Sequence, residues 1–555
     1  MRITLAGPCL LSAALLALPG IGTLAAQDGP ELTLAGELSA RVEGLRDRGA
    51  LRIRGSVVPY DPLTVAVYEQ RGFAPLWDRG TVARLLVEIE AADEDGLDSE
   101  SYHLGALRGA SRRPTSASAL ADLDVLATDA FVRLSRDLRF GKVTPQGPAD
   151  PWNAPWVFGG PEAVANLVAT VASGRVADVL SESRAQHFAY RGLARALADL
   201  RRVEAGGGWE PVPPGPALAR DSVDARVPLL RRRLRLSGDM AEADAPGGEG
   251  AGSLRFDSAL EAGVRAFQHR HGLDEDGVVG NGTLAALNVP VERRIEQVRV
   301  NLERARWVSR QLPDTFVVVN VAGARVHVFR GDRVAFETRA IVGTGSAQTP
   351  VFSAPMRYVE LNPTWTVPPG IVGEVLDAVR RDPGYLQRQG IRVLEGTKPI
   401  DPSGVDFSRY TAGDFPYALR QDPGPANPLG RIKLMLPNEH HVYLHDTPLR
   451  ELFAEEERLF SHGCVRVEDP VGLAEMVLGD PTRWSRATLE AAIRTGATTA
   501  IPLATPVQVF VLYWTAATDP EGVLHFHRDV YERDLAVLAA LDAPPAEGTP
   551  EGRVR

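Results

Sequence analysis

The chain has 555 residues, of which 24% are charged and 44% are hydrophobic, and its formal net charge at pH 7 is −10. A globular chain of this length has room for about three domains. The acidic balance and the lack of a long basic run exclude nucleic acid as an expected partner.

The N-terminus has the pattern of a secretory signal over residues 1–26. Arg2 precedes an apolar stretch from Cys9 to Leu18, and small residues follow through Ala26. This stretch is shorter than the ~20 residues of a membrane-spanning helix, so cleavage is expected rather than anchoring. The mature protein is therefore expected in the periplasm, with no integral membrane segment after signal cleavage.

Residues 27–220 are expected to form a helical scaffold domain that ends in a Gly- and Pro-rich linker over 206–216. Two stretches carry apolar residues at helical spacing, which is typical of helices packed on a core. Their apolar positions are Val82, Leu85, Leu86 and Ile89 in the first and Leu123, Leu126, Ala130, Phe131, Leu134 and Leu138 in the second.

Residues 221–290 are expected to form a small module of three short helices. Val227 marks the first, Asp257 caps the second, and Thr283 opens the third. His269 and His271 have the appearance of metal ligands, but two histidines without a third ligand are more often surface residues, and no metal is expected here.

Residues 291–315 read as a charged linker helix, and residues 316–500 as a mainly β domain. A hairpin over 316–321 and 325–329 is followed by strands over 335–342 and 356–361. An insert over about 370–430 turns helical and then loop-like. An insert of this length in a compact domain is usually a lid or binding element, so we expect a movable cap.

Residues 501–555 are expected to form a C-terminal hairpin and tail. The hairpin strands are predicted over 506–515 and 524–527, on either side of a turn at 519–522. This hairpin either adds to the sheet of the β domain or braces the scaffold. The whole chain is thus predicted to be a multi-domain α+β protein.

Cys464 is the only cysteine outside the signal, so it cannot close an internal disulfide. Four of the eleven histidines lie within 25 residues of it, at positions 440, 441, 445 and 462. A thiol is mostly protonated at pH 7, and imidazole is the side chain best suited to accept its proton. The sequence therefore predicts a nucleophilic cysteine.

His445 is the preferred base, because it can reach the sulfur from a neighbouring strand, whereas His462 is only two residues away in the chain. If His462 proves to be the base, the two roles must be exchanged. Gly463 gives the backbone freedom, so the amides of Gly463 and Cys464 can turn toward one oxyanion. This pattern predicts acyl transfer through a thioester.

A zinc site is the alternative, because His441, Tyr443 and His445 would share one face of an extended chain. Zinc would occupy the proposed nucleophile, and the spacing matches neither a His-Glu-x-x-His helix nor a paired-cysteine site. No metal and no cofactor are predicted.

These residues resemble the catalytic domain of the bacterial L,D-transpeptidases. His445 is followed by a gap of fifteen residues and then by Ser461-His462-Gly463-Cys464-Val465-Arg466, and the resemblance extends over 348–352 and 361–368. It implies that Cys464 is the nucleophile, His445 the general base, and the amides of His462, Gly463 and Cys464 the oxyanion hole. It also implies that the carbonyl of Asp446 orients the base, while the Asp446 side chain is no triad member.

Two further regions resemble parts of this family's large, multi-domain branch. Residues 68–77 look like its N-terminal scaffold, and residues 266–288 are similar to the common peptidoglycan-binding domain. That module either binds the wall or braces the catalytic domain. In this branch a comparable insert covers the catalytic cleft.

Three side chains are candidates for substrate binding. The guanidinium of Arg466 suits a stem carboxylate, although an ion pair with Glu468 or Asp469 is an equal alternative. Trp365 and Tyr443 either wall the cleft or belong to the core.

The resemblance implies a transferase that forms 3-3 peptidoglycan cross-links, with peptidoglycan peptide stems as partners. Cysteine acyl transfer from a tetrapeptide donor stem would release D-alanine, and carbapenems would acylate Cys464. The alternatives are an L,D-carboxypeptidase that uses the same thioester, and a non-catalytic peptidoglycan-binding scaffold.

Overall fold

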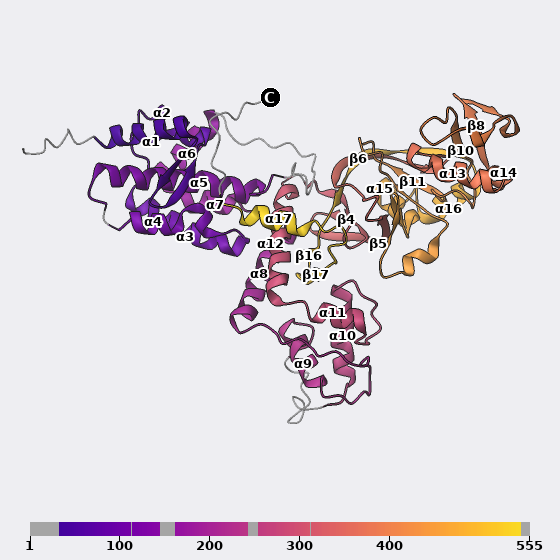
Figure 1. Cartoon of the computed structure of the whole chain (residues 1–555), viewed down its shortest axis with the longest axis horizontal. Helices are drawn as coiled ribbons and strands as arrows, with labels where there is room; N and C mark the ends of the chain where they lie inside the picture. The colour runs from indigo at the N-terminus through magenta and orange to yellow at the C-terminus, as the bar shows by residue number, and fades with distance from the viewer. Residues whose placement is uncertain (1–32, 113, 145–160, 242–253, 311, 545–555) are drawn as a thin grey trace, which may run out of the picture.

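The computed structural model describes residues 33–112, 114–144, 161–241, 254–310 and 312–544. Figure 1 shows three bodies around a central helix: helices α1–α7 on one side, α9–α11 below, and a β-rich body on the other side. The expected multi-domain α+β organisation is confirmed. The predicted signal over 1–26 and the last residues of the predicted tail lie outside the described residues.

The first body is a helical scaffold built around the long helix α5. The apolar positions predicted at helical spacing lie in α3 and α5, where nearly all of these side chains are buried. Its elements are α1 (Leu34–Arg48), β1 (Ala50–Ile53), β2 (Ser56–Pro59), α2 (Pro62–Gln70), α3 (Arg79–Ala91), α4 (Leu104–Ala110), α5 (Ala117–Phe140), α6 (Pro161–Ala172), α7 (Val176–Ser183) and α8 (Phe188–Ala205), with 3-10 turns at Ala92–Asp95 and Ser99–Tyr102.

The stretch from Tyr68 to Trp77 is held against α5 by buried hydrogen bonds. The Asp124 carboxylate on α5 accepts hydrogen bonds from the Tyr68 hydroxyl (2.8 Å) and from the amides of Leu76 and Trp77 (3.0 Å each). Because a buried carboxylate is costly unless it is hydrogen-bonded, this stretch is fixed on α5. Its role in the described structure is therefore structural.

The second body is the predicted three-helix module. Its helices are α9 (Val227–Leu236), α10 (Ser258–Arg270) and α11 (Asn281–Leu287). Asp257 caps α10 as predicted, since its carboxylate accepts from the Leu260 amide at 2.9 Å. His271 was expected at the surface and is instead buried, with Nδ1 2.7 Å from the Phe267 carbonyl oxygen.

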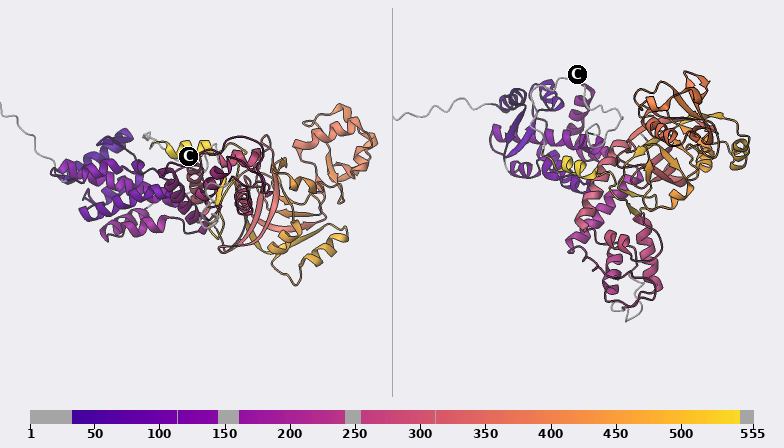
Figure 2. Two further views of the ribbon diagram at one scale, coloured as in Figure 1. Left: turned by 90° about the horizontal axis from the view of Figure 1, so that it is seen from below. Right: turned by 45° about the vertical axis from the view of Figure 1, so that its right-hand side comes forward.

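The charged linker helix predicted over 291–315 is observed as α12 (Val291–Val308), and most of its residues are buried. It packs against α8 and against the C-terminal helix α17 (Asp534–Asp542), and Figure 2 shows it at the centre of the molecule. Its charged residues are buried because they find partners there: Arg306 contacts Glu303 at 2.7 Å, and Arg304 contacts Asp534 at 2.6 Å. Helix α12 is therefore the central helix that the three bodies surround (Figure 1).

The third body is a β-barrel. One sheet has the strand order β13-β5-β14-β12-β11-β6-β15-β3-β4, and β4 also pairs with β5, which closes it. The strands are β3 (Thr315–Asn320), β4 (Arg325–Arg330), β5 (Arg333–Gly343), β6 (Phe352–Leu361), β11 (Ile432–Met435), β12 (Leu444–His445), β13 (Leu459–Ser461), β14 (Val465–Val467) and β15 (Thr499–Leu512). Helices α15 (Pro470–Leu478) and α16 (Arg486–Arg494) follow β14, and a 3-10 turn spans Arg450–Ala454.

Alternation along each barrel strand separates an apolar interior from a polar outer face. Val317, Val319, Val326 and Val328 fill the interior with no exposed surface, and so do Leu434, Leu444 and Val465 on the opposite side. The residues between them face outward. Both polar regions described below lie on this outer face.

The insert folds as a unit of its own. It contains β7 (Trp365–Thr366), α13 (Pro369–Arg381), α14 (Tyr385–Arg388), β8 (Ile391–Glu395), β9 (Lys398–Ile400) and β10 (Ala418–Gln421), with 3-10 turns at Pro402–Gly404 and Phe407–Arg409. Its four strands form a separate sheet, β7-β10-β8-β9, over a hydrophobic core of its own. The expected helix is present, but the second half is a sheet and not a loop. Both views of Figure 2 show the insert projecting from the barrel.

The C-terminal hairpin differs from the prediction. Its turn lies at the predicted position, but its strands are β16 (Ala516–Thr518) and β17 (Leu524–Phe526). The stretch predicted as its first strand belongs to β15, which starts at Thr499 and pairs with β3 and β6 inside the barrel. A mostly apolar run fits a central strand as well as a hairpin strand, so its pairing partner cannot be read from the run itself.

Within the described residues, no helix combines the length and the apolar character needed to cross a lipid bilayer.

Candidate active site

His445 and Cys464 are brought together by two neighbouring parallel strands, β12 and β14. In the register of β12 and β14, Leu444 pairs with Val465 and His445 with Arg466. Since Leu444 and Val465 point into the barrel, His445 and Cys464 face outward together, with their Cα atoms about 8 Å apart by strand geometry. The imidazole therefore comes from an adjacent strand, as the sequence predicted.

The ring of His445 is fixed by the next residue. Its Nδ1 lies 2.5 Å from the carbonyl oxygen of Asp446, which is the contact that the family resemblance implied. A carbonyl only accepts, so Nδ1 carries the proton and Nε2 is the acceptor nitrogen of the neutral ring; the Pro428 carbonyl is a second backbone acceptor close to the ring. Burial, and then the charge of Arg466, lowers the pKa of His445 to about 3, so the ring is neutral near pH 7.

The Asp446 side chain has a different task. Its carboxylate accepts from the Arg431 amide at 2.9 Å and contacts the Arg450 guanidinium at 3.1 Å. Gly430 carries φ +59°, and a Cβ there would lie 2.4 Å from the same carboxylate. Asp446 therefore holds the chain that enters β11.

The Cys464 thiol is partly exposed and uncharged at rest. Burial raises its pKa above the ordinary value, and the Tyr443 backbone and the Lys433 ammonium only partly offset this. The sulfur itself contacts the His441 carbonyl oxygen at 3.9 Å. A neutral thiol must give its proton to a base as it attacks, which is general base catalysis. A thiolate held ready in advance is not what this environment favours.

The backbone around Cys464 is held on both sides. The Gly463 carbonyl accepts from Thr349 Oγ1 at 2.9 Å, and the Cys464 carbonyl accepts from Ser461 Oγ at 2.5 Å. In a trans peptide the carbonyl and the next N–H point in opposite directions, so Thr349 turns the Cys464 amide away from itself. Gly463 has φ +108°, a conformation that other residues rarely adopt.

The predicted oxyanion hole needs one correction. The Gly463 amide already donates to Ser461 Oγ at 3.1 Å, because the hydroxyl folds back under the turn. The amides of His462 and Cys464 have no acceptor among the described residues. The available donors are therefore two and not three. The Ser461 hydroxyl thus shapes the turn that presents Cys464.

Thr349 was not recognised as a site residue from the sequence. It is fully buried, and it also accepts from the Gly343 amide at 2.9 Å, while its own amide donates to the Tyr531 hydroxyl at 3.2 Å. Thr349 is 114 positions from Gly463 in the chain. Spacing alone offers no signal for such a contact.

Arg466 is left without either of its expected ion-pair partners. Glu468 pairs with Arg339 at 2.8 Å, and Asp469 pairs with Arg486 at 2.6 Å. Within the described part of the chain, no carboxylate lies at ion-pair distance from Arg466, which is partly buried on the face of Cys464. The guanidinium is thus free for a substrate carboxylate.

Of the two predicted aromatic residues, only Tyr443 lies beside the cysteine. Val465 N donates to the Tyr443 carbonyl at 3.1 Å, and the Lys433 ammonium lies 4.2 Å from the Tyr443 ring centroid. Trp365 instead pairs with Gln421 in the sheet of the insert and packs on the core of the insert. Lys433 was missed, although its position between Ile432 and Leu434 in β11 indicates an outward side chain.

His462 points into solvent and not toward the sulfur. Its side chain is half exposed, and Nε2 lies 3.3 Å from the Glu374 carboxylate on α13. This contact joins the nucleophile loop to the insert. His462 is therefore placed as a surface contact of the insert, and His445 remains the candidate base.

The expected common face of His441, Tyr443 and His445 is wrong for His441. This residue has φ +56° in a turn before β12, so the chain is not extended there. Its carbonyl oxygen, rather than its ring, lies 3.9 Å from Cys464 Sγ. Across the described ranges, no group of three or more His, Cys, Asp or Glu side chains has the arrangement of a metal site.

Three family models match the chain. The model of the L,D-transpeptidase catalytic domain matches residues 314–509, a model named "Scaffold domain" matches residues 62–197, and a model named "Putative peptidoglycan binding domain" matches residues 224–287. The first match covers the barrel strands, apart from the last three residues of β15, together with the insert.

A Haemophilus influenzae protein named "Putative L,D-transpeptidase" is 30% identical over 249 residues, which cover 44% of this chain and 49% of that protein. The chain thus matches about half the length of this curated relative. Among solved structures, an L,D-transpeptidase of Xylanimonas cellulosilytica is 16% identical with a TM-score of 0.19. A fused Zn-dependent amidase/peptidase/peptidoglycan-binding protein of Clostridium acetobutylicum is 13% identical with a TM-score of 0.15. Each aligns over 54% of this chain and 100% of its own.

Proposed function

This chain carries the catalytic domain of the L,D-transpeptidase family together with a scaffold domain and a peptidoglycan-binding domain, and we propose that it joins two peptidoglycan peptide stems by cysteine acyl transfer. The donor would be a tetrapeptide stem and the product a 3-3 cross-link. The observation that carries this proposal is the pairing of β12 with β14, which sets a neutral, oriented imidazole beside a lone thiol.

The first half-reaction forms the thioester. His445 Nε2 accepts the thiol proton as Cys464 Sγ attacks the carbonyl carbon of the third stem residue. The amides of His462 and Cys464 stabilise the oxyanion. The peptide bond to D-alanine then breaks, and the leaving amine takes the proton from His445.

The second half-reaction transfers the acyl group. The side-chain amine of an acceptor stem attacks the thioester and gives its proton to His445, which returns it to the departing sulfur. Arg466 is proposed to bind a stem carboxylate, and Tyr443 to line the cleft beside it. These roles follow from the position of both residues on the outer face with Cys464.

The same thioester can be resolved by water, which would make the protein an L,D-carboxypeptidase. The partial exposure of Cys464 favours this second candidate, because water reaches the sulfur unless the insert excludes it. We propose that the insert acts as the cap. We also propose that the protein is exported to the periplasm and acts at the cell wall.

The test is incubation of the purified protein with tetrapeptide-bearing wall fragments, followed by mass spectrometry. Cross-linked dimers with release of D-alanine are expected. Tripeptides without dimers would identify the carboxypeptidase. Unchanged fragments would leave only a wall-binding scaffold and would overturn the enzymatic proposal.

A further inference from the structure

A cavity of about 440 Å³ lies where the scaffold, the three-helix module, the barrel and the C-terminal hairpin meet; we call it the junction cavity. Figure 1 shows these four parts converging, with α8, β16 and β17 between β4 and the module. Its walls come from all four: Phe188 from α8, His269 from α10, Phe316 from β3, His327 from β4 and His525 from β17. None of the residues proposed for acyl transfer lines it.

Histidines are concentrated in this cavity. Five of the eleven in the chain line it: His187, His269, His327, His525 and His527. Two contact carboxylates, since His269 Nδ1 lies 2.8 Å from Glu275 and His525 Nε2 lies 3.1 Å from Asp519. The other three are uncharged near pH 7, because burial lowers the pKa of each and brings that of His527 to about 3.

The three uncharged imidazoles have unmet hydrogen-bonding capacity. His187 Nε2 is buried without a hydrogen-bond partner among the described residues. His327 Nε2 approaches Glu337 only to 3.7 Å, which is too long for a hydrogen bond. A neutral imidazole offers one donor and one acceptor, and leaving these unpaired in a wall costs free energy.

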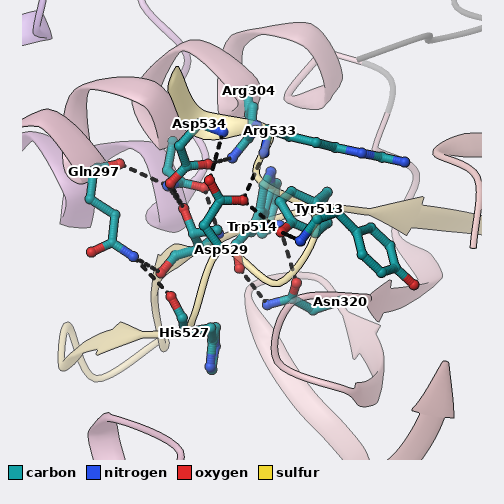
Figure 3. A network of polar contacts seen from close by, with 12 residues as sticks. Gln297, Arg304, Asn320, Tyr513, Trp514, His527, Asp529, Arg533 and Asp534 are labelled. Atoms are coloured by element: carbon teal, nitrogen blue, oxygen red, sulfur yellow. Dashed lines mark hydrogen bonds and ion pairs between the residues drawn. The ribbon is translucent and has the colours of Figure 1, made fainter. Parts of the chain in front are cut away.

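The backbone of His527 is anchored, while its ring makes no hydrogen bond with the anchoring residues. Its carbonyl oxygen accepts from Gln297 on α12 at 2.9 Å, and Figure 3 shows its ring pointing away from the polar network that anchors this segment. In that network Asp534 contacts Arg304, and Tyr513 donates to Asp529 at 2.7 Å. The backbone is thus held while the ring stays free, which is a preorganised arrangement for a ligand.

One wall of the junction cavity is aromatic. Phe316 and Phe329 stack with ring centroids 4.9 Å apart, Phe188 lies 6.0 Å from Phe329, and Trp514 also lines the space. Phe316 and Phe329 are buried and support this wall, while the partly exposed Phe188 and Trp514 offer apolar faces beside the imidazoles. A ligand that matches both must have apolar faces and many uncharged hydrogen-bonding groups.

The charged groups of the cavity wall are more acidic than basic. Arg325 pairs with Glu337, and Arg339 pairs with Glu468. The Arg458 guanidinium is used by the carbonyls of Ala340, Glu455 and Gly323. Seven carboxylates and three guanidinium groups line the wall, so an anionic ligand would be repelled, whereas an uncharged ligand meets no such repulsion.

We propose that the junction cavity binds the glycan strand of peptidoglycan through two linked N-acetylated sugars, an inference that rests on the proposed function. The C–H faces of the sugars stack on the aromatic wall, and hydroxyl and acetamido groups bond to His327 and His527. The volume lies within the ~300–1,000 Å³ of small-molecule sites. The binding site would thus be shared between domains rather than confined to the module.

The position of the cavity agrees with its proposed role. Arg339 lines the cavity, and the Glu468 amide donates to its carbonyl across β5 and β14. Glu468 is four residues from Cys464, so roughly 13 Å of strand separates the cavity wall from the sulfur. Three stem residues span about 10 Å when extended. Three residues alone thus fall a few Å short of the sulfur, and the lactyl group that links a stem to its sugar adds about the length of one more residue.

The test is calorimetric titration of the full chain carrying Cys464→Ala with the linear tetramer of β-1,4-linked N-acetylglucosamine. One tetramer per chain is expected to bind, and the matched glucose tetramer, which lacks acetamido groups, is expected to bind at least 10-fold more weakly. Trp514→Leu and His327→Gln should each weaken binding at least 10-fold. The controls Trp484→Leu and His440→Gln remove the same side chains outside the cavity and should keep the affinity within 2-fold.

No binding heat up to the solubility of the tetramer would overturn the proposal. So would equal affinity in the cavity variants and the controls, which would place the sugar elsewhere, for instance on the module alone. Circular dichroism and thermal unfolding verify that each variant is folded, and a mild second variant, His327→Asn, replaces any that is not. Because Cys464→Ala cannot form a thioester, failure here is distinct from failure of the acyl-transfer proposal, which appears as missing thioester on the unmodified chain.

Discussion

Two sets of histidines lie in separate sites, one on strands of the barrel and one in the junction cavity, and they differ in what their ring nitrogens contact. Burial brings the pKa of both His445 and His527 to about 3, so both are neutral. His445 is bound to the Asp446 carbonyl, which fixes its tautomer, whereas the ring of His527 makes no hydrogen bond with another described residue. An imidazole that is oriented by the backbone suits proton transfer, and one that is left open suits ligand binding.

The largest expected effect is at the sulfur itself. A carbapenem should acylate the unmodified protein once per chain, and intact-protein mass spectrometry should show one adduct. Cys464→Ala should abolish this adduct, because no other cysteine follows the predicted signal. An adduct that persists in Cys464→Ala would refute the assignment of the nucleophile.

The next largest effect is expected when the imidazole of His445 is removed. His445→Gln should lower the rate of Cys464 acylation by about 10²–10⁴-fold, the usual contribution of a positioned base. His440→Gln is the matched control, since that ring packs on Phe352 at 5.0 Å and contacts neither strand of the pair. If His462→Ala alone causes the large loss, the two histidines must exchange roles.

A smaller loss is expected when the backbone frame is loosened. Thr349→Val removes the hydroxyl that holds the Gly463 carbonyl, so the Cys464 amide loses its orientation. The kcat of acyl transfer should fall by about 10–100-fold with little change in KM, because the oxyanion forms only in the transition state. Thr349→Ser keeps the hydroxyl and should retain most of the rate. Equal kcat in Thr349→Val and the unmodified chain would contradict this role.

The contact between insert and nucleophile loop should matter less. Glu374→Gln weakens the contact with His462, and exposed contacts of this kind contribute about 0.2–1 kcal/mol, which corresponds to at most about a 5-fold change. The change should appear in KM for stem substrates. Asp377→Asn, one turn further along α13, removes a local pair with Arg380 and serves as the control. A loss above 10-fold would show that the insert completes the site.

The smallest expected effect is the response of acylation to acid. The folded pKa of His445 lies at about 3, below its ordinary value, so its base function is present above this pH and is lost only as the pH falls through about 3. Stopped-flow acylation should therefore change less than 2-fold between pH 7 and pH 5. An acid limb near pH 6.5 would show that the ring is solvated and protonated in the free enzyme.

The free energy of unfolding should also decrease as the pH falls, but over a higher pH range than acylation. In the unfolded chain both histidines regain an ordinary pKa near 6.5, so their contribution to stability is complete above that pH and decreases as the pH falls from there toward 3. Thermal unfolding should thus occur at lower temperature at pH 5 than at pH 7, and its pH dependence should be weaker in His527→Gln.

The sequence allowed the fold class and the central pair of residues to be predicted, because both depend on local patterns. Strand alternation and the spacing from His445 to Cys464 are read directly from neighbouring positions. Thr349, Glu374 and the shared cavity depend on contacts between segments far apart in the chain. The burial of α12 was missed for a similar reason: its arginines read as solvent-facing until carboxylates from other elements are placed beside them.

The insert enters and leaves the barrel through a single pair of strands, since β7 and β10 are hydrogen-bonded neighbours. A unit with its own core and adjacent ends is an exchangeable cassette: evolution can lengthen, trim or replace it while the chemistry of the barrel stays intact. Selectivity for one wall architecture over another can therefore diverge quickly among such enzymes without any change at the sulfur.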